Sequence, residues 1–252
     1  MEIIISDTYN EMSVKAFNDL VMLLQSKNPL VCTASGDSPT GLYKEFVRNN
    51  TNKKVDMYNW NFVGLDEWMG MNGTDEGSCR YHLDKQLFHR LKIKDEQICF
   101  FDGRAKDPEM ECARIESYIN KHAGIDVSIL GLGLNGHVGM NEPGTPVTSR
   151  SHVTKIDPIT QKAAQKYFKE PREVTHGITL GLADLLDAKH IILLVSGEKK
   201  AGIVKQVLED KISEELPASL LRNHPGLRIY LDAGAAKNIN SPQSTSTVHS
   251  KS

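Results

Sequence analysis

The sequence predicts an α/β fold in which a mostly parallel sheet carries helices on both faces. Short apolar runs, such as Val127–Leu130 and His190–Val195, alternate along the chain with segments of helical periodicity. These runs are apolar almost throughout, which is typical of strands that are buried on both faces of a parallel sheet. Polar, glycine-rich segments follow several of the runs. Because open α/β sheets bind ligands at the carboxyl ends of their strands, those segments are where a site is expected.

The individual elements follow from local patterns. Phe17, Leu20, Val21 and Leu24 share one helical face. Ser38 before Pro39 is a favourable N-cap with proline at the first helical position. The expected strands are 2–5, 29–33, 61–65, 98–101, 127–130, 178–180, 190–195 and 227–231. The expected helices are 11–26, 41–47, 79–88, 108–121, 158–168, 182–186 and one that runs from 197 to 208. This alternation is that of a Rossmann-like, open α/β/α sandwich, with residues 1–238 as a single domain and 239–252 as a loose tail.

Composition excludes several classes of protein. The chain has 252 residues, of which 25% are charged and 39% are hydrophobic, as expected of a soluble globular protein. The formal net charge of −2 gives no basic footprint for nucleic acid or for an anionic membrane. The N-terminal apolar run is too short for a signal peptide, and no stretch approaches a membrane span. We therefore expect neither a nucleic acid nor a membrane as partner.

The cysteines predict a reducing, cytoplasmic setting and no metal site. No two of them form a CxxC pair, and no histidines cluster beside them. Cys32 lies inside an apolar strand, where a cysteine is most often a small buried hydrophobe. The four cysteines are Cys32, Cys79, Cys99 and Cys112.

The segment from Gly131 to Gly144 is the strongest functional signal. It follows the apolar strand 127–130 and holds five glycines, which allow tight turns and close approach to a ligand. His137 can take and give protons near neutral pH. Asn135 and Glu142 are placed to orient its ring. The pattern indicates a proton-transfer site, and the alternative is an ordinary strand-to-helix turn with a surface histidine.

Three weaker signals lie after other strands. The loop Ser35, Gly36, Asp37, Ser38 leads into a helix, a layout that suits an anion, although a merely capped turn is equally compatible. Asp66 and Glu67 end a strand, so at least one carboxylate is expected to be exposed as a general base; a solvated acid pair is the alternative. Lys199 and Lys200 follow a strand, where positive charge opposes the helix dipole and favours a ligand role for one of them. Together these groups suggest isomerase-like chemistry on a sugar phosphate.

At these residues the chain resembles the glucosamine-6-phosphate deaminases (isomerases), and is similar to the branch associated with galactosamine 6-phosphate. The resemblance extends from about Ile3 to Leu231. It is carried chiefly by the specific motif from Gly133 to Pro143, GLNGHVGMNEP. Supporting motifs are SGDSP at 35–39, LDEW at 65–68, ITLG at 178–181 and GEKKA at 197–201.

The resemblance implies a deaminating aldose–ketose isomerisation of an amino-sugar 6-phosphate, without a cofactor. It implies that Asp66 carries the C2 proton, that His137 helps to open the ring, and that Asn135 and Glu142 hold the histidine. The phosphate would be bound by the loop Ser35, Gly36, Asp37 and Ser38, and by Lys166 and Lys200. The family contains several oligomeric states, so a homo-oligomer is allowed.

The sequence departs from the family pattern in three respects. Asn135 stands where many members have Asp, so a differently charged partner for the histidine is expected. Lys166 replaces an arginine, and it brings a point charge without the bidentate fork. His152 and Thr154 replace basic residues that bind an acetylated activator in allosteric members. We therefore expect no activation by an N-acetyl amino-sugar phosphate.

Two other functions compete with this interpretation. A 6-phosphogluconolactonase has a similar fold and a related histidine motif, but it lacks the ending Asn141-Glu142-Pro143. A non-catalytic sugar-phosphate-binding protein would not need Asp66 and His137, and a regulator of that type would carry a DNA-binding helix-turn-helix that is not visible here. The long polar segment 144–175 suggests a mobile lid over the site.

Overall fold

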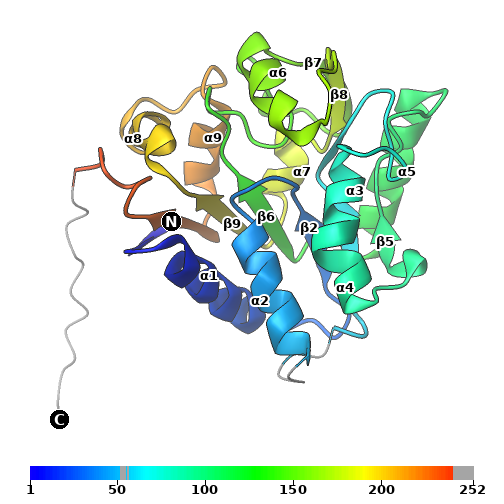
Figure 1. Cartoon of the computed structure of the whole chain (residues 1–252), viewed down its shortest axis with the longest axis horizontal. Helices are drawn as coiled ribbons and strands as arrows, with labels where there is room; N and C mark the ends of the chain where they lie inside the picture. The colour runs from blue at the N-terminus through cyan, green and yellow to red at the C-terminus, as the bar shows by residue number, and fades with distance from the viewer. Residues whose placement is uncertain (52–54, 56, 241–252) are drawn as a thin grey trace.

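The computed structural model describes residues 1–51, 55 and 57–240, which are organised around a seven-stranded sheet (Figure 1). The strand order is β1-β10-β9-β6-β2-β3-β5, and every neighbouring pair is parallel. The predicted α/β class is confirmed. The strands are β1 Glu2–Ser6, β2 Leu30–Thr33, β3 Asn61–Gly64, β5 Ile98–Cys99, β6 Val127–Gly131, β9 His190–Val195 and β10 Leu227–Asp232.

Helices cover both faces of this sheet, because successive strand side chains enter two different cores. In β9, Ile192 and Leu194 belong to one core, whereas Ile191, Leu193 and Val195 belong to the other. The first core is shared with α1 to α4, and the second with α5, α7, α8 and α9. The helices are α1 Tyr9–Leu23, α2 Thr40–Thr51, α3 Cys79–Leu83, α4 His89–Leu91, α5 Pro108–Lys121, α6 Pro158–Ala164, α7 Leu182–Leu186, α8 Ala201–Glu209 and α9 Pro217–Leu220.

Helix boundaries differ from the prediction where local capping decides them. Helix α1 begins at Tyr9 because Thr8 and Glu11 form a reciprocal capping box. Helix α2 begins at Thr40, so Pro39, and not Ser38, precedes its first residue. The predicted continuous helix 79–88 is instead α3, a π-helical turn over Asp84–Phe88, and α4. Likewise, the helix predicted for 158–168 is α6 followed by a 3₁₀ turn over Gln165–Tyr167, and a 3₁₀ turn over Glu198–Lys200 precedes α8.

A second, three-stranded antiparallel sheet was not predicted. It consists of β4 Asp66–Trp68, β8 His176–Thr179 and β7 His152–Lys155, in that order. Residues 66–68 therefore do not end a strand of the main sheet. They turn into a strand of their own, and Thr179 is in register with both Asp66 and His152. In Figure 1, β7 and β8 lie with α6 above the main sheet. The segment 144–175 therefore supplies the strand β7, which was not predicted, in addition to the predicted helix near 158–168.

The structure tests the predictions for the cysteines, for a membrane span and for the C-terminal tail only in part. All four cysteines are buried and free, as expected for Cys32. In the described part of the chain, no helix combines the length and the apolar character needed to cross a membrane. The loose tail predicted for 239–252 lies outside the described residues, apart from 239 and 240.

Candidate active site

The candidate site lies where the direction of winding in the main sheet reverses. Strands β2 and β6 are neighbours, but the chain continues from β2 to β3 on one side and from β6 to β9 on the other. The loops that leave these two strands face each other across the reversal, which is the usual ligand position in an open α/β sheet. They are residues 34–39 after β2 and 132–144 after β6. The sequence-predicted anion loop and histidine loop are therefore brought together.

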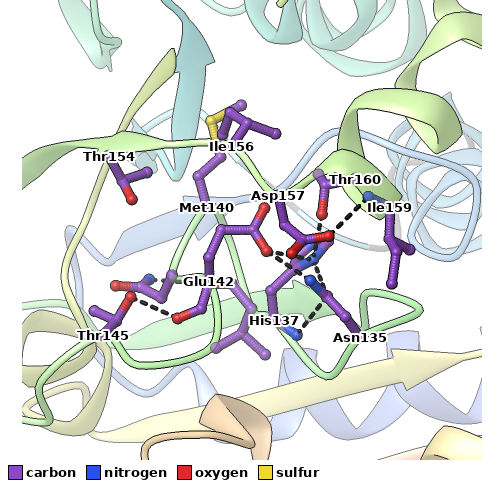
Figure 2. A network of polar contacts seen from close by, with 12 residues as sticks. Asn135, His137, Met140, Glu142, Thr145, Thr154, Ile156, Asp157, Ile159 and Thr160 are labelled. Carbon is purple, nitrogen blue, oxygen red and sulfur yellow. Dashed lines mark hydrogen bonds and ion pairs between the residues drawn. The ribbon is translucent and has the colours of Figure 1, made fainter. Parts of the chain in front are cut away.

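A short chain of side chains holds the imidazole of His137 (Figure 2). Its Nδ1 lies 2.6 Å from Asn135 Oδ1. The amide of Asn135 donates in turn to Glu142 Oε2 at 2.7 Å. Glu142 Oε2 is 3.6 Å from His137 Nδ1. The three residues proposed from sequence to act together are thus in contact.

The direction of these hydrogen bonds fixes the tautomer of His137. Because Asn135 uses its nitrogen on Glu142, its oxygen faces the imidazole and can only accept. Nδ1 therefore carries the proton, and Nε2 presents a lone pair. Burial, followed by the positive charge of Lys200, lowers the pKa of His137 to about 4. The ring is neutral at pH 7 and is arranged to accept a proton on Nε2.

Glycines make room for this ring. A Cβ on Gly133 would lie 2.2 Å from the Cε1 and Nδ1 atoms of His137, far inside van der Waals contact. The Gly133 N–H also donates to the His137 carbonyl at 2.9 Å, which closes the turn. Gly136, inside the turn, has a φ of +86°, a conformation that favours glycine. The glycine content of this loop therefore has a direct steric cause.

Asp66 and Glu67 have different surroundings, and neither is a solvated acid. Glu67 is fully buried and accepts the N–H groups of Trp68, Cys79 and Arg80 at 2.9, 2.9 and 3.1 Å, so it caps the start of α3. The side chain of Asp66 is also buried, and its neighbour in hydrogen-bonding reach is the Cys79 thiol. The expectation of an exposed carboxylate is wrong, because β4 turns into the second sheet instead of ending at the edge of the first.

Burial changes the acidity of both carboxyl groups. It raises the pKa of Asp66 to about 6, against the opposing hydrogen bond from Cys79. It raises the pKa of Glu67 to about 7, against the three backbone donors. Asp66 lacks such donors and is the carboxylate of the pair that is suited to proton transfer.

The second sheet connects Asp66 to the histidine loop. Thr179 of β8 is paired with Asp66 in the antiparallel register. Its hydroxyl accepts the N–H of Met140, in the histidine loop, at 3.2 Å. A Cβ on Gly139 would lie 2.9 Å from the same hydroxyl. The strand that carries Asp66 and the loop that carries His137 are thus packed on one threonine.

The anion loop is pre-formed and has free donors. Gly36 has a φ of +113°, and Tyr9 donates to the Asp37 carbonyl at 2.8 Å. Gly41 N–H, at the start of α2, is already taken by the Tyr9 hydroxyl at 2.6 Å. Within the described residues, the backbone N–H groups of Ser35, Gly36, Asp37 and Ser38 make no hydrogen bond. These four donors of the loop itself are therefore available to bind an anion.

Two lysines from distant segments reach this loop and the histidine loop. Lys166 forms an ion pair with the Asp37 carboxylate, and both side chains are mostly exposed. Lys200 donates to the Leu132 carbonyl at 2.5 Å. Burial, followed by the charge of Lys166, lowers the pKa of Lys200 to about 8. The predicted phosphate ligands are adjacent. The carboxylate of Asp37 is itself an anion, however, and it neutralises Lys166 by forming an ion pair with it.

Sequence reasoning missed two residues at the site. Thr160 Oγ1 lies 3.1 Å from His137 Nδ1, and the Cys79 thiol contacts both Asp66 and Ser35. Neither belongs to the motifs, and a lone threonine or cysteine in a helix gives no signal by itself. No group of three or more metal-ligating side chains lies close together in the described part of the chain.

Comparison with known proteins agrees with this geometry. Residues 12–229 match the family described as glucosamine-6-phosphate isomerases/6-phosphogluconolactonase. The chain belongs to this family. Two relatives in it are the glucosamine-6-phosphate deaminases of Bacillus velezensis and Oceanobacillus iheyensis. The first is 36% identical over 238 residues, which cover 94% of this chain and 99% of the relative. The second is 35% identical over 241 residues, which cover 95% and 96%.

Solved structures place the chain within the same family. A monomeric glucosamine-6-phosphate deaminase superimposes with a TM-score of 0.91 at 32% identity, over 95% of this chain and all of that one. The 6-phosphogluconolactonase of Trypanosoma brucei gives 0.74 at 22% identity, over 95% and 98%. At that identity the likeness is one of fold, so the choice between the two activities of the family depends on the site.

Proposed function

We propose that this protein converts an amino-sugar 6-phosphate, with glucosamine 6-phosphate as the first candidate, into the ketose 6-phosphate and ammonia. The observation that carries the proposal is a neutral imidazole with a free Nε2, held through Asn135 by Glu142, in the same site as a buried carboxylate. Relatives of similar length that are named glucosamine-6-phosphate deaminases support it. Galactosamine 6-phosphate, which differs at the C4 hydroxyl, is the second candidate.

The residues divide the reaction into two proton transfers. In the first, His137 Nε2 takes the proton of the C1 hydroxyl and returns it to the ring oxygen, so that the C1–O5 bond breaks and an aldehyde forms. In the second, Asp66 removes the proton from C2 and delivers it to C1, while one N–H proton of the amine passes to the C1 oxygen, so that C1 becomes a hydroxymethyl carbon and C2 an imine. Water then hydrolyses the imine, and ammonia leaves. Neither step needs a hydride or an electron acceptor.

Cations and loop donors would hold the phosphate away from these groups. The free N–H groups of Ser35, Gly36, Asp37 and Ser38 suit phosphate oxygens, and Lys166 and Lys200 supply positive charge. Because both protein bases act on C1 and C2, binding at the opposite end of the sugar fixes the reacting carbons without blocking them.

A substrate panel tests the proposal. We expect ammonia and a ketose 6-phosphate in equal amounts from glucosamine 6-phosphate, and no hydrolysis of 6-phosphogluconolactone. Lactone hydrolysis without ammonia release would assign the chain to the other activity of its family. Binding of both compounds without turnover would instead indicate a non-catalytic sugar-phosphate-binding protein.

The pH dependence of kcat/KM should be bell-shaped. Asp66 must be ionised to accept a proton, and its pKa is raised to about 6, so activity should fall as the pH drops below 6. Lys200 must be charged to bind phosphate, and its pKa is lowered to about 8, so KM should rise above pH 8. His137, with a pKa of about 4, stays neutral throughout. Initial rates from pH 5.5 to 9.5 check this, and activity that does not fall between pH 6.5 and 5.5 would contradict the assignment of Asp66.

Removing the charge of Asp37 should improve substrate binding. Its carboxylate now pairs with Lys166 and would face the phosphate. Exposed ion pairs are worth about 0.2–1 kcal/mol, so we expect Asp37→Asn to lower KM by a factor of about 1.4 to 5 with little change in kcat. Steady-state kinetics at low ionic strength measure this. A raised KM would mean that the carboxylate helps to bind the substrate.

The positions that bind an acetylated activator in allosteric members carry no permanent positive charge here. His152 and Thr154 both lie on β7, and His152 Nδ1 is 2.7 Å from the Arg150 carbonyl. We therefore expect the same KM and kcat with and without N-acetylglucosamine 6-phosphate. A large fall in KM on adding that compound would show that another cation has taken over the role.

A further inference from the structure

Helix α6 and its 3₁₀ continuation contact the candidate site at two separate points. Thr160, near the start of α6, is 7% exposed and has its hydroxyl 3.1 Å from His137 Nδ1. Lys166, in the 3₁₀ turn at the other end, is paired with Asp37 in the anion loop. Lys166 is six positions after Thr160, a separation of roughly 9 Å along a helix axis, which is comparable to an extended hexose 6-phosphate. Helix α6 and its 3₁₀ continuation therefore connect the anion loop to His137.

The contact of Thr160 with the imidazole has a defined direction. His137 Nδ1–H points to Asn135 Oδ1 at 2.6 Å, so the more distant Thr160 oxygen is a second acceptor of the same proton. The Thr160 hydroxyl proton is then free to be donated. Glu142 lies within its reach, and the Oε1 atom of Glu142 is buried with no hydrogen-bond partner among the described residues. Figure 2 shows Thr160 and Asn135 converging on the ring from different segments.

We propose that Thr160 is a positioning residue for His137. When an anion binds the loop that Lys166 contacts, helix α6 changes the orientation of the imidazole through Thr160. The inference rests on the proposed function for its catalytic meaning, but the contact it describes can be measured without substrate. By accepting from Nδ1–H and donating to Glu142, the hydroxyl favours the tautomer with Nε2 unprotonated. The charged groups that face the ring are Glu142 from its own loop, Lys200 from the 3₁₀ turn before α8, and Asp157 at the start of α6.

The test uses ¹⁵N-histidine-labelled protein, with inorganic phosphate as the probe of the anion loop. The His137 ring signals are assigned by their loss in His137→Gln. We expect the wild type to show the Nδ1–H tautomer and a His137 shift on adding phosphate. In Thr160→Val the Nε2–H tautomer should grow and the response to phosphate should vanish, whereas Thr160→Ser should behave as the wild type. Thr154→Val is the matched control, because among the described residues the Thr154 hydroxyl bonds to the Lys155 carbonyl and to no group of the site.

Kinetics provide the second readout. We expect Thr160→Val to lower kcat about tenfold with KM unchanged, and Thr160→Ser to stay within twofold of the wild type. Unchanged tautomer populations and phosphate response in Thr160→Val would overturn the proposal, whatever its kcat. Absence of ammonia release by the wild type would contradict the proposed function instead, while the NMR result would still decide the role of Thr160.

Discussion

Replacing Asp66 by Asn should lower kcat by roughly 10²- to 10⁴-fold, the usual contribution of a positioned general base. The amide keeps the shape of the side chain but cannot take the C2 proton. Stability should be unchanged or slightly higher, because the carboxylate is buried with its pKa raised to about 6, so its charged form is disfavoured by the fold. Ammonia release and thermal unfolding of the same preparation measure both effects.

The neighbouring carboxylate provides the control. Glu67 accepts three backbone N–H groups at the start of α3, and an amide would leave at least one of them facing another donor. We expect Glu67→Gln to lower the free energy of unfolding by about 1–3 kcal/mol while the folded protein keeps most of its kcat. If Glu67→Gln lost kcat and Asp66→Asn did not, the assignment of the base would be reversed.

Replacing Gly133 by Ala should lower kcat/KM by about 10²-fold, although no catalytic group is removed. The added Cβ would lie 2.2 Å from His137 Nδ1, so the imidazole must rotate or shift. Either movement breaks the 2.6 Å bond to Asn135 and releases the tautomer that leaves Nε2 free. Gly133 does not have a positive φ, so the effect is one of space and not of backbone strain.

The control for this variant lies two residues earlier. A Cβ on Gly131 would have no atom within 4 Å, and Gly131 does not have a positive φ either. Gly131→Ala should therefore keep nearly full activity. Equal losses in the two variants would mean that the loop responds to any substitution, and that the packing of Gly133 under the ring has no special role.

The sequence predicts the main sheet well because its strands are buried on both faces. A continuous apolar run such as Ile191–Val195 must be buried on both sides, and this pattern is typical of a central parallel strand. The second sheet was missed for the opposite reason. A strand was predicted at 178–180, where β8 lies, but β4 is only three residues long and β7 has no buried residue, so no periodic pattern marks these two. Their pairing is a tertiary effect that local patterns do not contain.

The same distinction applies to the site. The histidine loop is local, so a motif of glycines with Asn135, His137 and Glu142 predicts the contacts that the fold makes. The surroundings of Asp66 depend on β8, more than a hundred residues away in the chain, and its burial was not expected. Thr160 and Cys79 are close to the site only through packing. The ion pair between Asp37 and Lys166 also joins distant segments and changes the interpretation of the anion loop.

Conversion of glucosamine 6-phosphate that carries deuterium at C2 tests the central claim most directly. If Asp66 takes the C2 proton after His137 opens the ring, NMR of the product should show a 2-ketose 6-phosphate. Its deuterium should have left C2 for C1 or solvent, with one ammonium formed for each ketose. A product that keeps deuterium on C2, or that forms without ammonium, would contradict proton transfer from C2 and with it the proposed roles of both residues.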